Sequence, residues 1–352
     1  MHAYKNRGQF LPDEVYMMEV LLYIDDVGKA RLGKLKDVLS SNNIKYKLFE
    51  LGTKIEGNYD MILVIGNDKS MLKAVHELNS LGIPFLGVSS NNSVSFLMEV
   101  PFEKIELALN QIDRGEYRID ECDLLMGEIG KKSLIALNEI SVFPMRSATL
   151  MKYDLWIDGE YVWRDIADGI IISTPMGSTA YSMSAGGPMI MMNAQVFAIT
   201  PVNSIDLTRR PLVVPNKSVI EVCEISSKSE VEAIADGLER YRVDEEIILH
   251  KANSYVRFIR LKKGSHAYLR LLGKVKLAKE LIKMPPSAKL VMKVLEYEGP
   301  LTQKDIVKKT LLPPRTVRYA LSILLRKGII SKVTNLRDAR QSLYYIKVKS
   351  VE

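Results

Sequence analysis

The stretch Asp168–Pro188, DGIIISTPMGSTAYSMSAGGP, indicates both a local fold and a kind of ligand. Its β-branched start, Ile170–Ile172, is typical of a buried strand. The residues after it are small and many carry hydroxyl groups, while Gly177, Gly186 and Gly187 let the backbone approach a bound molecule closely. Such a segment suits a polar, phosphate-bearing small molecule better than a hydrophobic core.

On the N-terminal side of this stretch, strands alternate with helices. Hydrophobic patterning predicts strands over residues 20–24, 45–49, 61–65 and 84–88 and helices over 30–40, 70–81 and 102–114. That alternation favours a parallel, Rossmann-like sheet in a first domain, residues 1–118. From about residue 120, short alternating runs separated by turn residues predict a β-rich second domain, residues 119–275.

The C-terminal fifth of the chain carries the positive charge. Residues 285–352 hold 14 Lys and Arg against 5 Asp and Glu, a balance of +9, so the other 284 residues carry −2 of the total of +7. A stretch ending in Pro285-Pro286 predicts a linker, and beyond it the pattern predicts three helices and a β-hairpin. This order resembles the winged helix-turn-helix domain of archaeal and bacterial regulators.

A winged helix implies double-stranded DNA as a partner. The third predicted helix would be the recognition helix, and its polar face carries Arg315, Thr316, Arg318 and Tyr319. The loop of the hairpin adds Arg337 and Arg340, where phosphate contacts are natural. A solvated basic face or a dimerisation module is the alternative interpretation.

Composition argues against a secreted or membrane protein. No stretch approaches the roughly 18 apolar residues that span a bilayer, and the first residues lack the apolar core of a signal peptide. Two cysteines without metal-ligand spacing fit a reducing cytoplasm, and four scattered histidines argue against a metal held by the protein alone.

Several motifs together resemble the NAD kinase family. Family members read close to DG-x-x-x-STPTGSTAYS-x-SAGGP, from which this chain departs in the core of the match only at Met176. Further matches are Asn138-Glu139, Ile199-Thr200-Pro201, the run RPLVVP over residues 210–215 and Asp236-Gly237. The resemblance covers roughly residues 18–270. It implies an α/β domain, then a β-sandwich, with the active site between them.

The resemblance also implies roles for individual residues. The family transfers the terminal phosphoryl group of ATP or polyphosphate to the adenosine 2′-hydroxyl of NAD, a reaction that usually uses Mg²⁺ with ATP. Asp68 matches the aspartate that accepts the hydroxyl proton or helps to hold metal. The residues that match the NAD pocket are Asn138, Glu139, Asp168, Ser173, Thr174, Thr179, Ala180, Tyr181 and Ser184.

Departures from the family pattern fall on the side of the phosphoryl donor. The family's GGDG loop reads Gly66-Asn67-Asp68-Lys69 here. Side chains at 67 and 69 would obstruct phosphates or demand a backbone that only glycine adopts easily, whereas Lys69 could instead supply positive charge. The later loop, Gly87–Leu97, is one residue longer and has lost its later glycines, and Ile205 stands where the family often has histidine.

Two functions therefore compete. The first is an NAD kinase fused to a DNA-binding domain. The alternative is a catalytically impaired regulator that senses NAD or NADP and changes its affinity for DNA on binding. Either would be a homodimer or homotetramer by analogy with the family.

Overall fold

The computed structural model describes residues 17–24, 28–50, 52, 55–90, 95–261, 284–298, 300–334 and 342–346. In the first lobe its elements are β1 (Glu19–Ile24), η1 (Lys29–Arg31), α1 (Leu32–Ser41), β2 (Lys45–Leu48), β3 (Met61–Gly66), α2 (Asp68–Leu78), η2 (Asn79–Leu81), β4 (Phe85–Ser89), β5 (Val100–Pro101), η3 (Phe102–Lys104) and α3 (Ile105–Asp113).

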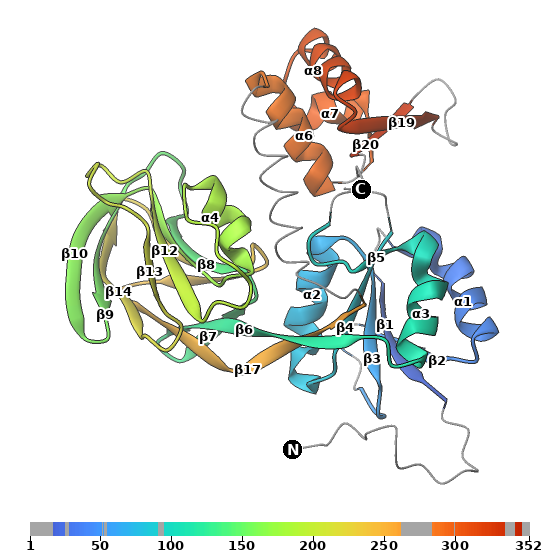
Figure 1. Cartoon of the computed structure of the whole chain (residues 1–352). Coiled ribbons are helices and arrows are strands. Elements are labelled where there is room, and N and C mark those ends of the chain that lie inside the picture. Colours follow the sequence, from blue (N-terminus) through green and yellow to red (C-terminus); the bar gives the residue numbers. More distant parts are fainter. Residues whose placement is uncertain are drawn as a thin grey trace.

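The first lobe is the predicted parallel sheet between helices (Figure 1). β1 pairs in parallel with β2 and β3, and β3 pairs in parallel with β4. Every residue of β3 is buried, as expected for a strand covered on both faces. One hydrophobic cluster joins the sheet to α1 and α3, and a second joins the other face to α2.

The second lobe is the predicted β-sandwich. Its elements are β6 (Arg118–Ile129), β7 (Lys132–Ala136), β8 (Glu139–Pro144), β9 (Met151–Ile157), β10 (Glu160–Ala167), β11 (Gly169–Ser173), η4 (Gly177–Thr179), α4 (Tyr181–Ser184), β12 (Val196–Val202), β13 (Leu212–Pro215), β14 (Ile220–Ser227), β15 (Val231–Ala235), β16 (Glu239–Val243) and β17 (Ile247–Arg260). One sheet has the order β13-β12-β11-β8-β15-β16, and it packs through a large buried cluster on β6, β7, β9, β14 and β17 of the other.

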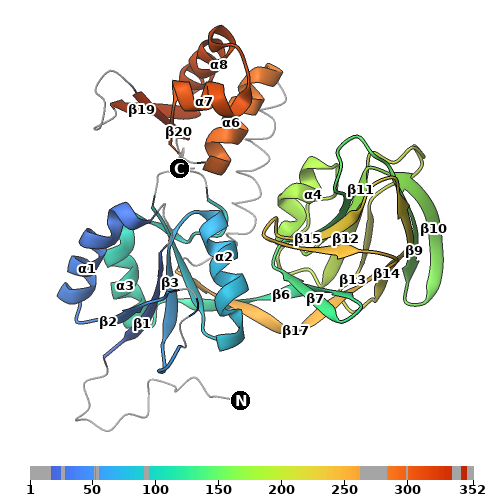
Figure 2. The same cartoon turned by 180° about the vertical axis from the view of Figure 1, so that it is seen from behind.

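Two long strands connect the lobes. β6 and β17 pair with each other in an antiparallel ribbon. At its start β17 pairs with β14 of the sandwich, and near its end Phe258 pairs with Phe85 of β4 in the first lobe. Figure 2 shows the ribbon running from one lobe to the other. The chain thus enters the second lobe through β6 and returns to the first lobe through β17, so the two lobes share one 11-stranded sheet.

The C-terminal part folds around its own core. It contains α6 (Pro286–Glu298), β18 (Leu301–Thr302), α7 (Gln303–Thr310), α8 (Pro314–Arg326), β19 (Ile330–Thr334) and β20 (Ser342–Ile346). Thr302 caps α7 in a reciprocal pair with Asp305, and Pro314 begins α8, as the sequence predicts. Buried residues of all three helices and of the hairpin form one cluster. Among the described residues, no helix is both long and apolar enough to cross a bilayer.

Candidate active site

The altered glycine loop adopts an ordinary helix start. The side chain of Asn67 accepts a hydrogen bond from Ser70 N at 3.1 Å, and Ser70 Oγ accepts one from Asn67 N at 2.9 Å. This capping box begins α2 at Asp68, two residues before the predicted start. Asn67 is extended with φ −131°, and Lys69 is an exposed helical residue. The expectation that these positions demand glycine backbone is therefore wrong.

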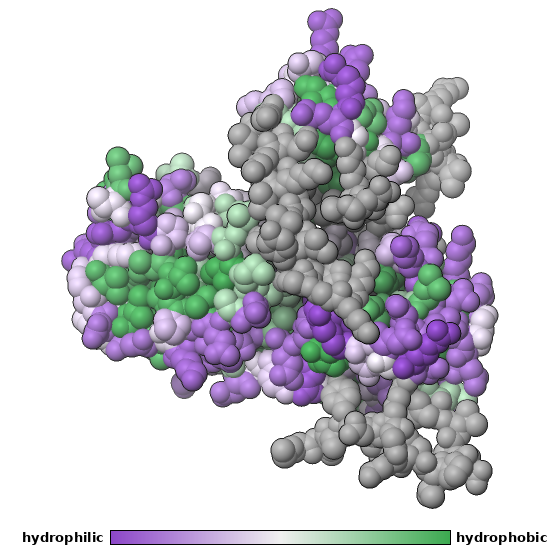
Figure 3. Space-filling view, in the orientation of Figure 1, coloured by the Kyte–Doolittle hydropathy of each residue, from purple (hydrophilic) through white to green (hydrophobic). Residues whose placement is uncertain are grey.

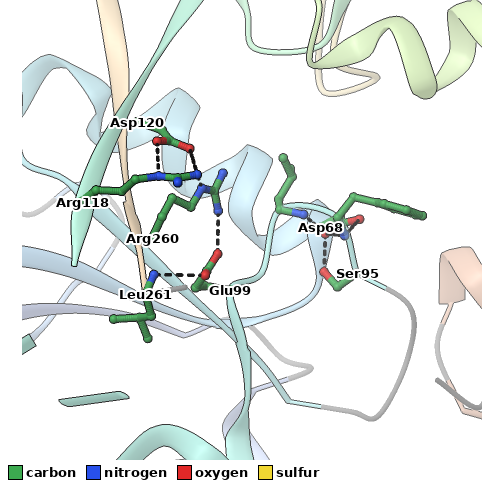
Figure 4. A network of polar contacts seen from close by, with 9 residues as sticks. Asp68, Ser95, Glu99, Arg118, Asp120, Arg260 and Leu261 are labelled. Atoms are coloured by element: carbon green, nitrogen blue, oxygen red, sulfur yellow. Dashed lines mark hydrogen bonds and ion pairs between the residues drawn. The ribbon is translucent and has the colours of Figure 1, made fainter. Parts of the chain in front are cut away.

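Asp68, the first residue of α2, holds a neighbouring loop. Its carboxylate accepts hydrogen bonds from Phe96 N at 2.8 Å and Leu97 N at 2.8 Å, and from the hydroxyl of Ser95 (Figure 4). A glycine at position 95 would lack this hydroxyl contact. The three donors fix the orientation of the carboxylate at the end of β3.

The same loop is anchored at its other end to the ribbon. Glu99 accepts hydrogen bonds from Arg260 Nη1 and from Leu261 N, both at 3.2 Å (Figure 4). The side chains of Glu99 and Arg260 are 2% and 3% exposed, so this is a buried ion pair. Arg260 also lies 3.5 Å from Asp120 of β6. The position of residues 95–99, the loop that the Asp68 carboxylate holds (the Asp68 loop), therefore depends on the end of β17.

On the second lobe, Leu137 and Asn138 form the turn between β7 and β8, and Glu139 begins β8. The carboxylate of Asp236, after β15, accepts hydrogen bonds from three successive backbone N–H groups: Leu137 at 2.8 Å, Asn138 at 2.7 Å and Glu139 at 3.2 Å. A carboxylate offers about four acceptor positions, and these donors occupy three of them. Asp236 thus fixes the backbone of the turn that carries two predicted ligand-binding residues.

The motif after β11 packs directly on this turn. Thr174 donates from its backbone N to Asn138 O at 2.9 Å and from Oγ1 to Leu137 O at 2.6 Å. Gly177 lies so close that an added Cβ would come within 2.0 Å of Asn138 O. Its φ is not positive, so this glycine is required for space rather than for backbone conformation.

The hydroxyl groups of the motif differ in their burial and in their hydrogen-bond partners. Ser173 and Thr174 are buried, and Ser178 and Ser182 bond within the protein, to Pro175 O and to Thr200 respectively. Ser178 and Ser182, which are not among the residues predicted to bind NAD, therefore support the local fold, whereas the buried Oγ of Ser173 has no hydrogen-bond partner among the described residues. The predicted residues that are at least partly accessible are Asn138, Asp168, Thr179, Ala180, Tyr181 and Ser184, and the ring of Tyr181 stacks on that of Phe143 with centroids 5.9 Å apart.

Asp168 lies at the other end of β11, half-buried, and accepts a hydrogen bond from Asn203 Nδ2 at 2.8 Å. The next residue, Ser204, donates to the buried Asp165 at 2.5 Å, as does Tyr153 at 3.1 Å. Burial, and then the charge of Asp165, raise the pKa of Tyr153 well above its usual value, so the phenol stays a donor. This network fixes the loop that faces Asp168.

The two sides of the site share one hydrophobic cluster. It contains Met71 of α2, Leu97 of the Asp68 loop and Leu137 before the Asn138 turn, and Met176 of the motif packs against it. His76 of α2 adds a polar link, with Nε2 2.9 Å from Asp236 Oδ2. Sequence reasoning overlooked Ser95 and His76 and took Asp236 only as a turn residue. The signal for Asp236 was its Asp-Gly pair, but its partners are distant in sequence.

The predicted DNA-contacting residues lie on α8 and beyond it. Arg315, Arg318 and Tyr319 are exposed and Thr316 is half-buried, whereas the apolar stripe of the same helix, Val317, Ala320, Leu321 and Leu324, is buried. Arg337 and Arg340 lie outside the described residues. Across the part of the chain that the structure describes, no three Asp, Glu, His or Cys side chains gather as metal ligands would.

Comparison with known proteins gives a consistent result. The model of the ATP-NAD kinase N-terminal domain matches residues 5–117, and that of the ATP-NAD kinase C-terminal domain matches residues 137–261. An NAD kinase of Methanothermobacter thermautotrophicus is 37% identical over 227 residues, which are 64% of this chain and 80% of that protein. An NAD kinase of Christiangramia forsetii is 31% identical over 66% of this chain and 81% of that protein.

Solved structures agree with the sequence matches. The crystal structure of an NAD kinase from Archaeoglobus fulgidus in complex with ATP superposes with a TM-score of 0.63 at 25% identity, over 74% of this chain and 99% of that one. Yeast NADH kinase complexed with NADH has the same TM-score at 22% identity, over 73% of this chain and 88% of that one, and shows the fold alone.

Proposed function

This chain belongs to the NAD kinase family and is a phosphotransferase, and we propose that it moves the terminal phosphoryl group of ATP to the adenosine 2′-hydroxyl of NAD, giving NADP. Polyphosphate is the alternative donor. The observation that carries the proposal is the shared cluster of α2, Leu137 and Met176, because it joins the helix that begins at Asp68 to the turn of Asn138 and Glu139.

In this proposal the donor lies at the start of α2. Helix N-termini favour phosphate, since their first N–H groups have no partner within the helix. Lys69 is exposed there and adds positive charge. Mg²⁺ would enter with ATP and would be held mainly by phosphate oxygens and water.

The acceptor lies on the second lobe. Asn138 and Glu139 hold the adenosine ribose, and Asp168, Thr179, Ala180, Tyr181 and Ser184 line the NAD pocket, with Ser173 and Thr174 supporting it from beneath. The 2′-oxygen attacks the terminal phosphorus, the bond to the bridging oxygen breaks, and ADP leaves with the bonding electrons. Asp68 takes the hydroxyl proton, which its fixed orientation favours.

The test is formation of NADP from NAD, ATP and Mg²⁺ by the purified full chain. We expect Asp68→Asn to lower kcat by about 10²-fold or more, the usual contribution of a positioned base. Asp37→Asn is the matched control, because Asp37 is an exposed aspartate on α1. Absence of NADP with the unaltered protein, or full activity in Asp68→Asn, would refute the proposal.

We further propose that residues 285–352 form a winged helix that binds DNA. The supporting observation is the division of α8 into a buried apolar stripe and a face that exposes Arg315, Arg318 and Tyr319, in a segment whose net charge is +9. Thr316 lies on the same helix, and Arg337 and Arg340 stay predictions. A salt-dependent gel shift should be lost in the double variant Arg315→Ala, Arg318→Ala and kept in Lys289→Ala, Lys293→Ala on α6. Equal binding by both pairs would contradict this assignment.

A homodimer or homotetramer remains our proposal for the assembly. Figure 3 shows apolar residues gathered over one face of the β-sandwich, and exposed hydrophobic side chains in that lobe include Ile205, Leu207 and Val213. Sedimentation of the full chain at several concentrations tests it, and a monomer throughout would exclude it.

A further inference from the structure

One polar contact joins the helix that begins at Asp68 to the turn that carries Asn138. His76 lies two turns along α2, and its Nε2 is 2.9 Å from Asp236 Oδ2. The side chain of Asp236 is fully buried, and that of His76 is 15% exposed. The other ring nitrogen, Nδ1, lies 4.0 Å from Glu239 Oε2 at the start of β16.

The chemistry of the two side chains determines which of them donates the hydrogen bond. Asp236 already accepts three backbone N–H groups, from Leu137, Asn138 and Glu139. An ionised carboxylate is an acceptor only, so the fourth hydrogen bond requires the proton on Nε2 of His76. The carboxylate is then filled by four donors, three from the turn and one from α2. Moving α2 away would leave a buried acceptor position without a partner, which is costly.

We propose that His76 and Asp236 are positioning residues that set the distance between the phosphoryl donor and the 2′-hydroxyl. Neither needs to touch a substrate. Asp236 orients the Asn138 turn through its backbone, and His76 ties that turn to the helix whose first residue is Asp68. This proposal rests on the proposed kinase activity, since it concerns the alignment of the two reactants. Misplacement of reacting groups by about 1 Å costs on the order of 10²-fold in rate.

The experiment compares His76→Ala and His76→Gln in the full chain. A glutamine side chain keeps one N–H donor that can reach Asp236, whereas alanine removes it. We expect His76→Ala to lower kcat by about tenfold or more, with the KM for ATP nearly unchanged, and His76→Gln to recover most of the loss. A purely structural role would not separate kcat from KM in this way. His250→Ala is the matched control, because His250 pairs with Glu128 in the sandwich.

A double-variant comparison tests whether the two residues act together. In Asp236→Asn one oxygen becomes an NH₂ group that faces N–H donors, so activity should fall, and adding His76→Ala should then cost little more. Equal kcat in His76→Ala and the unaltered protein would overturn the proposal, as would equal losses in His76→Ala, His76→Gln and His250→Ala. If His76→Ala does not fold, His76→Asn replaces it, because its shorter amide does not reach Asp236.

Binding separates this proposal from the proposed function. If the unaltered protein makes no NADP, the kinase proposal fails, and the contact is then tested by calorimetry with NAD. Weaker NAD binding in His76→Ala, restored in His76→Gln, supports the positioning role without catalysis. Unchanged NAD binding in both variants, or no uptake of NAD by the unaltered protein, overturns it.

Discussion

Replacing Gly177 by alanine tests how tightly the motif after β11 must pack on the Asn138 turn. The new Cβ would lie 2.0 Å from Asn138 O, and real Cβ atoms almost never approach within 3.0 Å of a neighbour. One of the two backbones must therefore move by about 1 Å. The turn cannot yield easily, because Asn138 O accepts the N–H of Thr174 and Asn138 N donates to Asp236.

The displacement falls on residues that we assign to NAD. A shift of about 1 Å in a reactant costs on the order of 10²-fold, so we expect kcat/KM for NAD to fall by about that factor. The KM for ATP should change little, because the donor is proposed to bind at the other lobe. Steady-state kinetics with each substrate varied in turn measures both effects.

The control for this variant is Gly33→Ala. An added Cβ at Gly33 in α1 meets nothing within 4 Å, and alanine is the better helix former. Thermal unfolding of both variants shows whether each is folded at the assay temperature. A folded Gly177→Ala protein with unchanged kcat/KM for NAD would refute the assignment of this turn to the acceptor site.

Three further outcomes follow from single contacts. Glu99→Gln removes the buried carboxylate beside Arg260 and leaves only the more exposed Asp120 at 3.5 Å, so urea unfolding should show a loss of about 3 kcal/mol; a loss within error of zero would contradict the buried pair. Hydrogen bonds from Arg164 hold the pKa of Asp154 below its usual value, so their stabilisation is complete above about pH 4 and is lost as pH falls through the lowered pKa. The free energy of unfolding of Arg164→Ala should therefore change less with pH below 4 than that of the unaltered protein. Acid unfolding curves of equal slope for the two proteins would contradict this. Burial, helped by nearby carboxylates, raises the pKa of the Cys223 thiol, so iodoacetamide at pH 8 should alkylate it more slowly than free cysteine, and an equal rate would contradict this.

Local chemistry made much of the fold predictable. The buried β3, the Thr302–Asp305 capping pair and the apolar stripe of α8 depend on residues close together in sequence, and the structure contains all three. The motif from Asp168 to Pro188 also begins as the predicted strand, β11, whereas the short helices η4 and α4 that follow it were not predicted. In these segments each residue meets its decisive partner within a few positions.

The glycine loop shows where residue types alone mislead. From the replacement of two glycines, the sequence left open obstruction of phosphates, backbone strain or a favourable positive charge at positions 67 and 69. Asn67 instead caps α2 with Ser70, three residues away, and neither position has a positive φ. Asparagine is among the preferred residues at a helix N-cap. Asparagine in place of glycine at position 67 is therefore also compatible with an ordinary helix start.

The sequence by itself determined most strands and helices, the Thr302–Asp305 cap and the segment that carries the family's motif, because hydrophobic period and capping act over a few residues. Only the tertiary structure decided what holds the site together. Asp236 reaches Asn138 across 98 positions and His76 across 160, and Phe258 of β17 returns to pair with Phe85. Such contacts join residues that are far apart in sequence and form only once the chain has folded. No local sequence pattern therefore predicts which distant groups will bind a buried carboxylate.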